Sequence, residues 1–135
     1  MTNILLIEDN YIDRFIAERQ LALSGLDASM QSVDNGKSGL EMVLGQFLET
    51  GFLPDVILVD YFMPIMNGLD FIQALAHADI EGKENIRVFL LTNLADPNLH
   101  LDPALQHLTG IVEKPMTSES FKRVILQASN QPRTI

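Results

Sequence analysis

The fold is decided by the stretch DVILVDYFMP at residues 55–64. Four consecutive apolar residues, 56–59, run directly into Asp60. A continuous Val/Ile/Leu run of this length predicts a strand that is buried on both faces, in the middle of a parallel sheet. In open α/β sheets, ligands bind in the crevice at the carboxyl ends of the strands, where Asp60 is expected to lie. Asp60 is therefore the first candidate site residue.

Strand and helix patterns alternate on both sides of this stretch. Apolar runs predict further strands, and helical periodicity or helix-start signals follow each of the five strands. The strands are predicted over residues 4–7, 28–33, 56–60, 86–92 and 110–113. The first helical pattern places four apolar residues on one face: Ile12, Phe15, Ile16 and Leu23. Five strands alternating with five helices predict an α/β fold, in which right-handed crossovers place helices on both faces of a parallel sheet.

Two elements of this pattern depart from regularity. Residues 28–33 place polar and apolar side chains on both faces of a strand, which predicts a more exposed edge strand. The fourth helix is predicted to be short or kinked, because Asp96-Pro97 and Asp102-Pro103 are two separate helix-start signals. Proline fits the first turn of a helix but breaks a helix interior.

Length and composition limit the classes of function. The 135 residues predict one domain over residues 1–130, with a short C-terminal tail at 131–135. A net charge of −9 argues against nucleic-acid binding, because polyanions are repelled. The chain has no cysteine for a disulfide or thiolate metal site, and no apolar run approaches the ~20 residues of a membrane span. A soluble, cytoplasmic protein is expected.

Polar side chains follow four of the five predicted strands: Glu8-Asp9, Asp60, Thr92 and Lys114. If the first and third strands are neighbours, three carboxylates crowd together and need a proton or a cation. Oxygen ligands with room for water favour Mg²⁺. A carboxylate at a strand end is also a possible nucleophile toward phosphorus. Lys114 and Thr92 would then supply the charge and hydrogen bond that phosphoryl transfer requires.

The same residues carry a family resemblance. In order and spacing, the chain resembles the receiver (phosphoacceptor) domain of bacterial two-component response regulators over essentially its full length. The resemblance rests on Glu8-Asp9, Asp60 with Met63-Pro64 and Asn67-Gly68, Thr92, and Lys114-Pro115. It implies a three-layer, flavodoxin-like fold with a doubly wound five-stranded parallel sheet in the order 2-1-3-4-5.

The resemblance also implies a function. Asp60 would accept a phosphoryl group from a histidine kinase or a histidine phosphotransfer protein. Mg²⁺ would be held directly by Asp9, Asp60 and the backbone carbonyl of Phe62, and by Glu8 through water. Thr92 and Lys114, the latter before a cis Pro115, would contact the phosphoryl group. A stand-alone receiver is implied: not an enzyme beyond assisting its own phosphorylation and dephosphorylation, and signalling by contact with an unknown downstream protein.

Other functions are weighed against this one. A hydrolase with an aspartyl-phosphate intermediate would resemble Asp-x-Asp at the strand end, where this chain has Phe62. A nucleotide-binding domain would carry Gly-x-Gly-x-x-Gly after the first strand, where this chain has Glu8-Asp9-Asn10. The main alternative is a receiver-like interaction module whose binding is independent of phosphorylation. This alternative is suggested by Ile111, which lies where the family usually has an aromatic ring that moves on activation.

Two apolar residues bear on the lifetime of the phosphoryl group. Phe62 and Leu94 lie two residues beyond Asp60 and Thr92, at positions where the family adjusts attack by water. Large apolar side chains there would hinder an in-line water. The sequence therefore predicts slow hydrolysis of the acyl phosphate.

Overall fold

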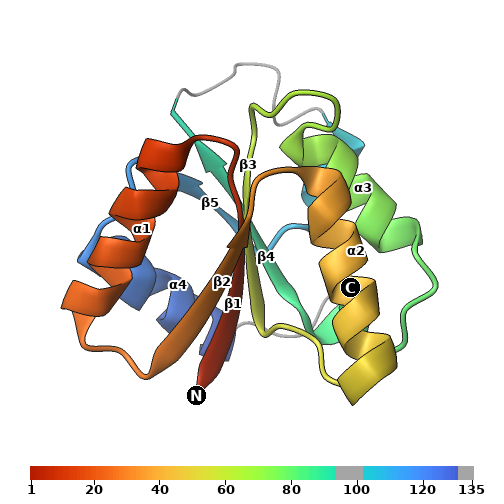
Figure 1. Ribbon diagram of the computed structural model, residues 1–135, viewed down its shortest axis with the longest axis horizontal. Helices are drawn as coiled ribbons and strands as arrows, with labels where there is room; N and C mark the ends of the chain where they lie inside the picture. Colours follow the sequence, from red (N-terminus) through yellow and green to blue (C-terminus); the bar gives the residue numbers. More distant parts are fainter. Residues whose placement is uncertain (94–101, 131–135) are drawn as a thin grey trace.

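The computed structural model describes residues 1–93 and 102–130. It contains one five-stranded sheet, and every neighbouring pair of strands in it is parallel. The strands are β1 (Thr2–Ile7), β2 (Ala28–Val33), β3 (Val56–Asp60), β4 (Arg87–Thr92) and β5 (Gly110–Glu113). Their order is β2-β1-β3-β4-β5 (Figure 1). The predicted fold class and strand order are confirmed.

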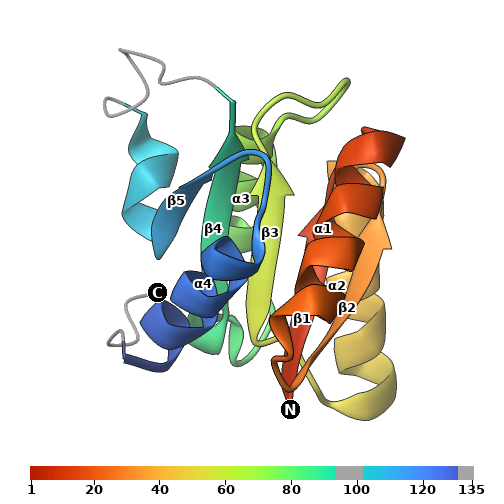
Figure 2. The same cartoon turned by 90° about the vertical axis from the view of Figure 1, so that its left-hand side faces the viewer.

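Helices cover both faces of the sheet and complete three layers (Figures 1 and 2). The α-helices are α1 (Tyr11–Ser24), α2 (Gly36–Thr50), α3 (Gly68–His77) and α4 (Ser118–Asn130). α1 and α4 cover one face, and α2 and α3 cover the other. All five residues of β3 are buried, as expected for a central strand with apolar side chains on both faces. β2 is a half-exposed edge strand, which confirms its prediction.

The sheet separates two apolar cores, to which alternate residues of each strand contribute. On β1, Leu5 and Ile7 join the core beneath α2 and α3, whereas Ile4 and Leu6 join the core beneath α1 and α4. Because β1 and β3 are held between two cores, their carboxyl ends are fixed on a rigid support.

The number of predicted helices is wrong for the described residues. They contain four α-helices and two short 3₁₀ helices, η1 (Lys83–Asn85) and η3 (Pro103–His107). η3 lies where the fourth helix was predicted, and Asp102 caps it by accepting a hydrogen bond from the Ala104 amide at 2.8 Å. β5 begins soon after η3 ends, so a helix that starts at Pro103 cannot extend further. Asp96-Pro97 lies outside the described residues.

α1 packs on the sheet with a different face from the one marked by its larger apolar residues. Ala17 and Leu21 are buried, whereas Ile12, Phe15 and Leu23 are 63%, 52% and 68% exposed. Helical periodicity identifies a stripe of apolar residues, but the sheet determines which stripe is covered. α1 therefore presents large apolar side chains to solvent.

Three helices begin at the carboxyl end of the sheet with an asparagine cap. The side-chain oxygens of Asn10, Asn35 and Asn67 accept backbone hydrogen bonds from the residues three positions on, at 3.0, 2.7 and 2.9 Å. Such caps satisfy amides that have no partner within the helix. They fix the starts of α1, α2 and α3 around the end of the sheet where the candidate site lies.

Candidate functional site

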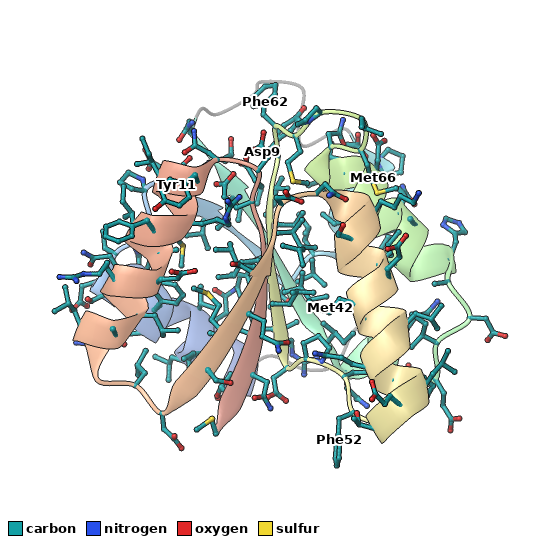
Figure 3. The ribbon with its side chains drawn as sticks, in the orientation of Figure 1. Asp9, Tyr11, Met42, Phe52, Phe62 and Met66 are labelled. Atoms are coloured by element: carbon teal, nitrogen blue, oxygen red, sulfur yellow. The ribbon has the colours of Figure 1, made fainter. Side chains whose placement is uncertain are left out.

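Three carboxylates meet where β1 and β3 end. These neighbouring strands pair Ile7 with Val59, so Glu8, Asp9 and Asp60 emerge side by side. One carboxylate oxygen from each of the three lies within 4.8 Å of the others. Glu8 is 1% exposed and Asp60 is 5% exposed, whereas Asp9 is open to solvent. Figure 3 shows Asp9 and Phe62 at the same end of the molecule. The acidic cluster predicted from the sequence is therefore present.

Lys114 brings a cation to this cluster. Its Nζ atom lies 2.5 Å from Glu8 Oε1, 2.8 Å from Asp13 Oδ2 and 3.3 Å from Asp60 Oδ1. The side chain is only 7% exposed. Three carboxylate oxygens therefore surround the ammonium group, which carries three N–H groups.

Thr92 reaches the same edge of the sheet as the last residue of β4. It is 7% exposed, and its carbonyl oxygen accepts a hydrogen bond from the Lys114 amide at 2.9 Å. The backbone of β4 thus fixes where the lysine emerges. The peptide bond between Lys114 and Pro115 is cis, as predicted.

Burial and crowding change the proton affinities of the site. Burial, followed by the hydrogen bond with Asp60, raises the pKa of Glu8 to about 8, although Lys114 acts in the opposite direction. Burial alone would lower the pKa of Lys114, but Asp13 and then Glu8 hold that pKa above its ordinary value. Lys114 is therefore charged at neutral pH, while Glu8 retains a proton unless a cation binds beside it.

The cluster fits a hard divalent cation. It offers carboxylate oxygens, the ligands that Mg²⁺ prefers, and one side of it is open for water ligands at Asp9. The buried Glu8 Oε1 atom accepts no hydrogen bond of good geometry from residues 1–93 or 102–130, although the Lys114 ammonium lies close by. A carboxylate oxygen in this state is suited to a cation or a bound water.

The loop after Asp60 is folded tightly against the site. The Gly68 amide donates to the Tyr61 carbonyl at 3.0 Å, and a Cβ atom on Gly68 would lie 2.5 Å from the Asp60 carbonyl oxygen. Only glycine permits this approach. The rings of Tyr61 and Phe62 stack with centroids 4.7 Å apart, and Phe62 is 67% exposed. Its ring therefore lies at the surface, in the loop that follows Asp60.

Ile65 at the tip of this loop is strained. Its φ of 71° lies in the left-handed region, which β-branched residues rarely adopt, and its side chain is fully exposed. We expect Ile65→Asn to raise the free energy of unfolding by about 1 kcal/mol, because asparagine tolerates this conformation and no packing is lost. Urea unfolding measures the change. Ile65→Ala removes the β-branch but supplies no polar side chain to hydrogen-bond locally, so it should give a smaller gain. An asparagine variant no more stable than the alanine variant would contradict the strain.

The site contains one residue that the sequence did not predict. Glu8, Asp9, Asp60, Thr92 and Lys114 all lie at the carboxyl end of the sheet. Asp13 joins them from the first turn of α1, where it contacts Lys114. A signal was available, because Asp13 is an acidic residue in the first turn of the helix that directly follows Glu8 and Asp9.

Three further residues bear on the predictions of phosphorylation-independent binding, slow hydrolysis and metal binding. Ile111, on the edge strand β5, is 51% exposed. Leu94 lies outside the described residues, so the predicted slow hydrolysis stays a prediction. The role of the Phe62 carbonyl as a metal ligand also stays a prediction.

Comparison with known proteins gives one family. A family model described as the response regulator receiver domain matches residues 4–126. The hybrid signal transduction histidine kinase D of Dictyostelium discoideum is 34% identical over 119 residues, which cover 87% of this chain but only 7% of that protein.

Solved structures of response regulators are similar to this chain. A two-component response regulator from Legionella pneumophila is 25% identical, with a TM-score of 0.80 over 97% of this chain and 100% of that chain. One from Cytophaga hutchinsonii, 23% identical, has the same fold, with a TM-score of 0.84 over 97% and 98% of the two chains.

Proposed function

Because the chain belongs to the response regulator receiver domain family of two-component systems, we propose that Asp60 accepts a phosphoryl group in a Mg²⁺-dependent reaction. The donor is a phosphohistidine of a histidine kinase or of a histidine phosphotransfer protein. The observation that carries this proposal is the position of Asp60, buried at the end of β3 between two carboxylates and the Lys114 ammonium.

Each residue has a role in the transfer. An Asp60 oxygen forms the new bond to phosphorus, while the phosphorus–nitrogen bond of the donor breaks and its electron pair stays on the imidazole. Lys114, already 3.3 Å from Asp60 Oδ1, stabilises the charge on the transferred group, and the Thr92 hydroxyl donates to a phosphoryl oxygen. Glu8, Asp9, Asp60 and the Phe62 carbonyl would hold Mg²⁺, which supplies positive charge to offset the carboxylates and the phosphoryl oxygens.

Exposed apolar side chains beside the site support a protein as donor and as recipient of the signal. Tyr11, Ile12 and Phe15 on α1 are all more than half exposed, as is Phe62 beside Asp60. Figure 3 shows Tyr11, Asp9 and Phe62 at one end of the molecule. Aromatic side chains of this kind are enriched at protein interfaces. The chain would pass its signal on by contact with another protein rather than by catalysis.

The remaining expectations from the sequence stay predictions: a single domain over residues 1–130, a stand-alone arrangement, and a cytoplasmic location. Within residues 1–93 and 102–130, no helix combines the length and apolar character needed to cross a bilayer.

The test is covalent modification. The protein is incubated with a small phosphodonor, with and without Mg²⁺, and its intact mass is measured. We expect a gain of one phosphoryl group that requires Mg²⁺, is removed by hydroxylamine as an acyl phosphate, and is absent in Asp60→Asn. Asp79→Asn, at an exposed aspartate remote from the cluster, serves as the matched control and should be modified normally. An unmodified wild-type protein, or an equally modified Asp60→Asn variant, would refute the proposal.

The second candidate is an interaction module whose binding does not depend on phosphorylation. It is favoured by Ile111, an aliphatic residue half-exposed on β5 that cannot reproduce the movement of an aromatic ring. Backbone amide shifts on adding beryllium trifluoride and Mg²⁺ separate the two candidates. Changes that reach β5 and α4 support a switch, whereas changes confined to the residues around Asp60 support the unswitched module.

A further inference from the structure

We propose that Asp13 is a positioning residue that holds the Lys114 ammonium in place for phosphoryl transfer; this inference rests on the proposed function of Asp60. Asp13 belongs to the first turn of α1, and Lys114 follows β5. Their side chains join two elements that are distant in the sequence, with Oδ2 and Nζ 2.8 Å apart. The contact therefore ties the phosphoryl-binding lysine to a helix.

The backbone of Asp13 is itself held in place. Its amide donates to the side chain of the cap residue Asn10 at 3.0 Å. One residue on, the Arg14 guanidinium donates to the Glu8 carbonyl at 2.7 Å. The first turn of α1 is thus bound to the segment that carries the acidic cluster. A carboxylate on this turn keeps a constant place relative to Asp60.

Of the three carboxylates on Lys114, two are used by the proposed reaction. Asp60 becomes the acyl phosphate, and Glu8 belongs to the cluster of carboxylates that suits a cation. Asp13 lies outside that cluster, and its side chain is 29% exposed. Its contact with Lys114 can therefore persist while the partners of the other two carboxylates change. One N–H of the ammonium stays on Asp13, and another is directed at the phosphoryl group.

Without Asp13, Lys114 would lose its fixed direction. Its four-carbon stem is flexible, and an ammonium is a point charge without the planar geometry of a guanidinium. The cavity between α1 and Lys114, lined by Asp13, Ile16 and Pro115 among others, has a volume of about 10 Å³. This is space for roughly one water molecule, so on the cavity side little solvent is available to replace the carboxylate.

Two effects of Asp13 can be separated by substitution. Its hydrogen bond orients Lys114 and should favour phosphoryl binding, whereas its negative charge partly neutralises Lys114 and should oppose it. Asp13→Ala removes both effects, and Asp13→Asn removes the charge but keeps an acceptor oxygen. If orientation dominates, alanine weakens phosphoryl binding about tenfold, as loss of an orienting hydrogen bond typically does, and asparagine restores it. Glu18→Ala, at an exposed acid on the same helix, controls for the change in net charge.

The experiment uses beryllium trifluoride with Mg²⁺ as the probe, and its affinity is measured by amide shifts in the wild type and the three variants. A second readout is the NMR signal of the Lys114 side chain in the protein without ligands. We expect Asp13→Ala to lower the affinity about tenfold and to make the Lys114 stem mobile, with Asp13→Asn close to the wild type. Unchanged affinity and mobility in Asp13→Ala would overturn the inference. Tighter binding in both Asp13 variants would also overturn it, because charge would then dominate.

Failure of the proposed function has a different signature. If the wild type shows no response that depends on Asp60, phosphoacceptance is wrong and the role of Asp13 in transfer falls with it. A response that is intact in the wild type and equal in Asp13→Ala leaves phosphoacceptance standing and removes only the role of Asp13. The Lys114 signal decides separately whether Asp13 holds the lysine at all.

Discussion

Replacing Lys114 with methionine is expected to slow phosphorylation of Asp60 by a small phosphodonor about 10²- to 10³-fold, the usual effect of removing one preorganised group that stabilises developing charge. Methionine keeps a long apolar stem and removes the ammonium that lies 3.3 Å from Asp60 Oδ1. The loss should appear in the rate at saturating Mg²⁺, measured by intact mass against time. Saturating Mg²⁺ also supplies charge to carboxylates that have lost their lysine, which keeps the variant folded.

Lys122 offers a matched control for this substitution. It lies on α4, its side chain is 49% exposed, and it forms a 3.5 Å ion pair with Glu119 at the surface. Lys122→Met changes the net charge of the protein by the same amount, and its rate should stay within about twofold of the wild type, because surface ion pairs contribute little. A Lys114→Met variant that reacts as fast as Lys122→Met would exclude Lys114 from the transfer.

The strands and the strand-end residues were predictable because their signals are local. A continuous apolar run implies a strand covered on both faces, and β3 is buried throughout. Since parallel strands end at one edge of a sheet, Asp60 and Lys114 could be expected at the same edge, but the strand order that brings them close came from the family resemblance. The prediction of a fourth α-helix was wrong for a local reason too. Asp102-Pro103 signals a helix start, but only the short η3 fits between Pro103 and β5.

The face that α1 packs on the sheet, and the contact that it makes with Lys114, could not be predicted in the same way. Its periodicity marks apolar residues, but the side of a helix that faces the sheet is set by packing, which leaves Ile12 and Phe15 exposed and Ala17 buried. The contact between Asp13 and Lys114 depends on that same rotation. A sequence signal for Asp13 existed, but without the docked position of α1 it is equally consistent with an acidic residue stabilising a helix start.

The stability of the protein without divalent cations is expected to fall as the pH rises from about 5 to 8. The pKa of Glu8 is raised from 4.5 to about 8 in the folded protein, so the folded state binds more protons than the unfolded state between these values. The free energy of unfolding then decreases with pH, by at most ~1.4 kcal/mol per unit. Solvent on the Asp9 side of the cluster screens part of this effect, so we expect a total loss of about 2–3 kcal/mol.

Urea unfolding at pH 5.5, 7 and 8.5, with a chelator or with excess Mg²⁺, measures this loss. Glu8→Gln cannot titrate, so its stability with the chelator should exceed that of the wild type at pH 8.5 and should vary less with pH. Glu119→Gln, at an exposed glutamate on α4, should follow the wild type. Mg²⁺ should stabilise the wild type most at high pH, where a cation replaces the missing proton, since metal ligands must be deprotonated to bind. A wild-type profile that is flat with the chelator would mean that Glu8 does not hold a proton over this range. A profile that Mg²⁺ leaves unchanged would mean that the carboxylates do not hold the cation.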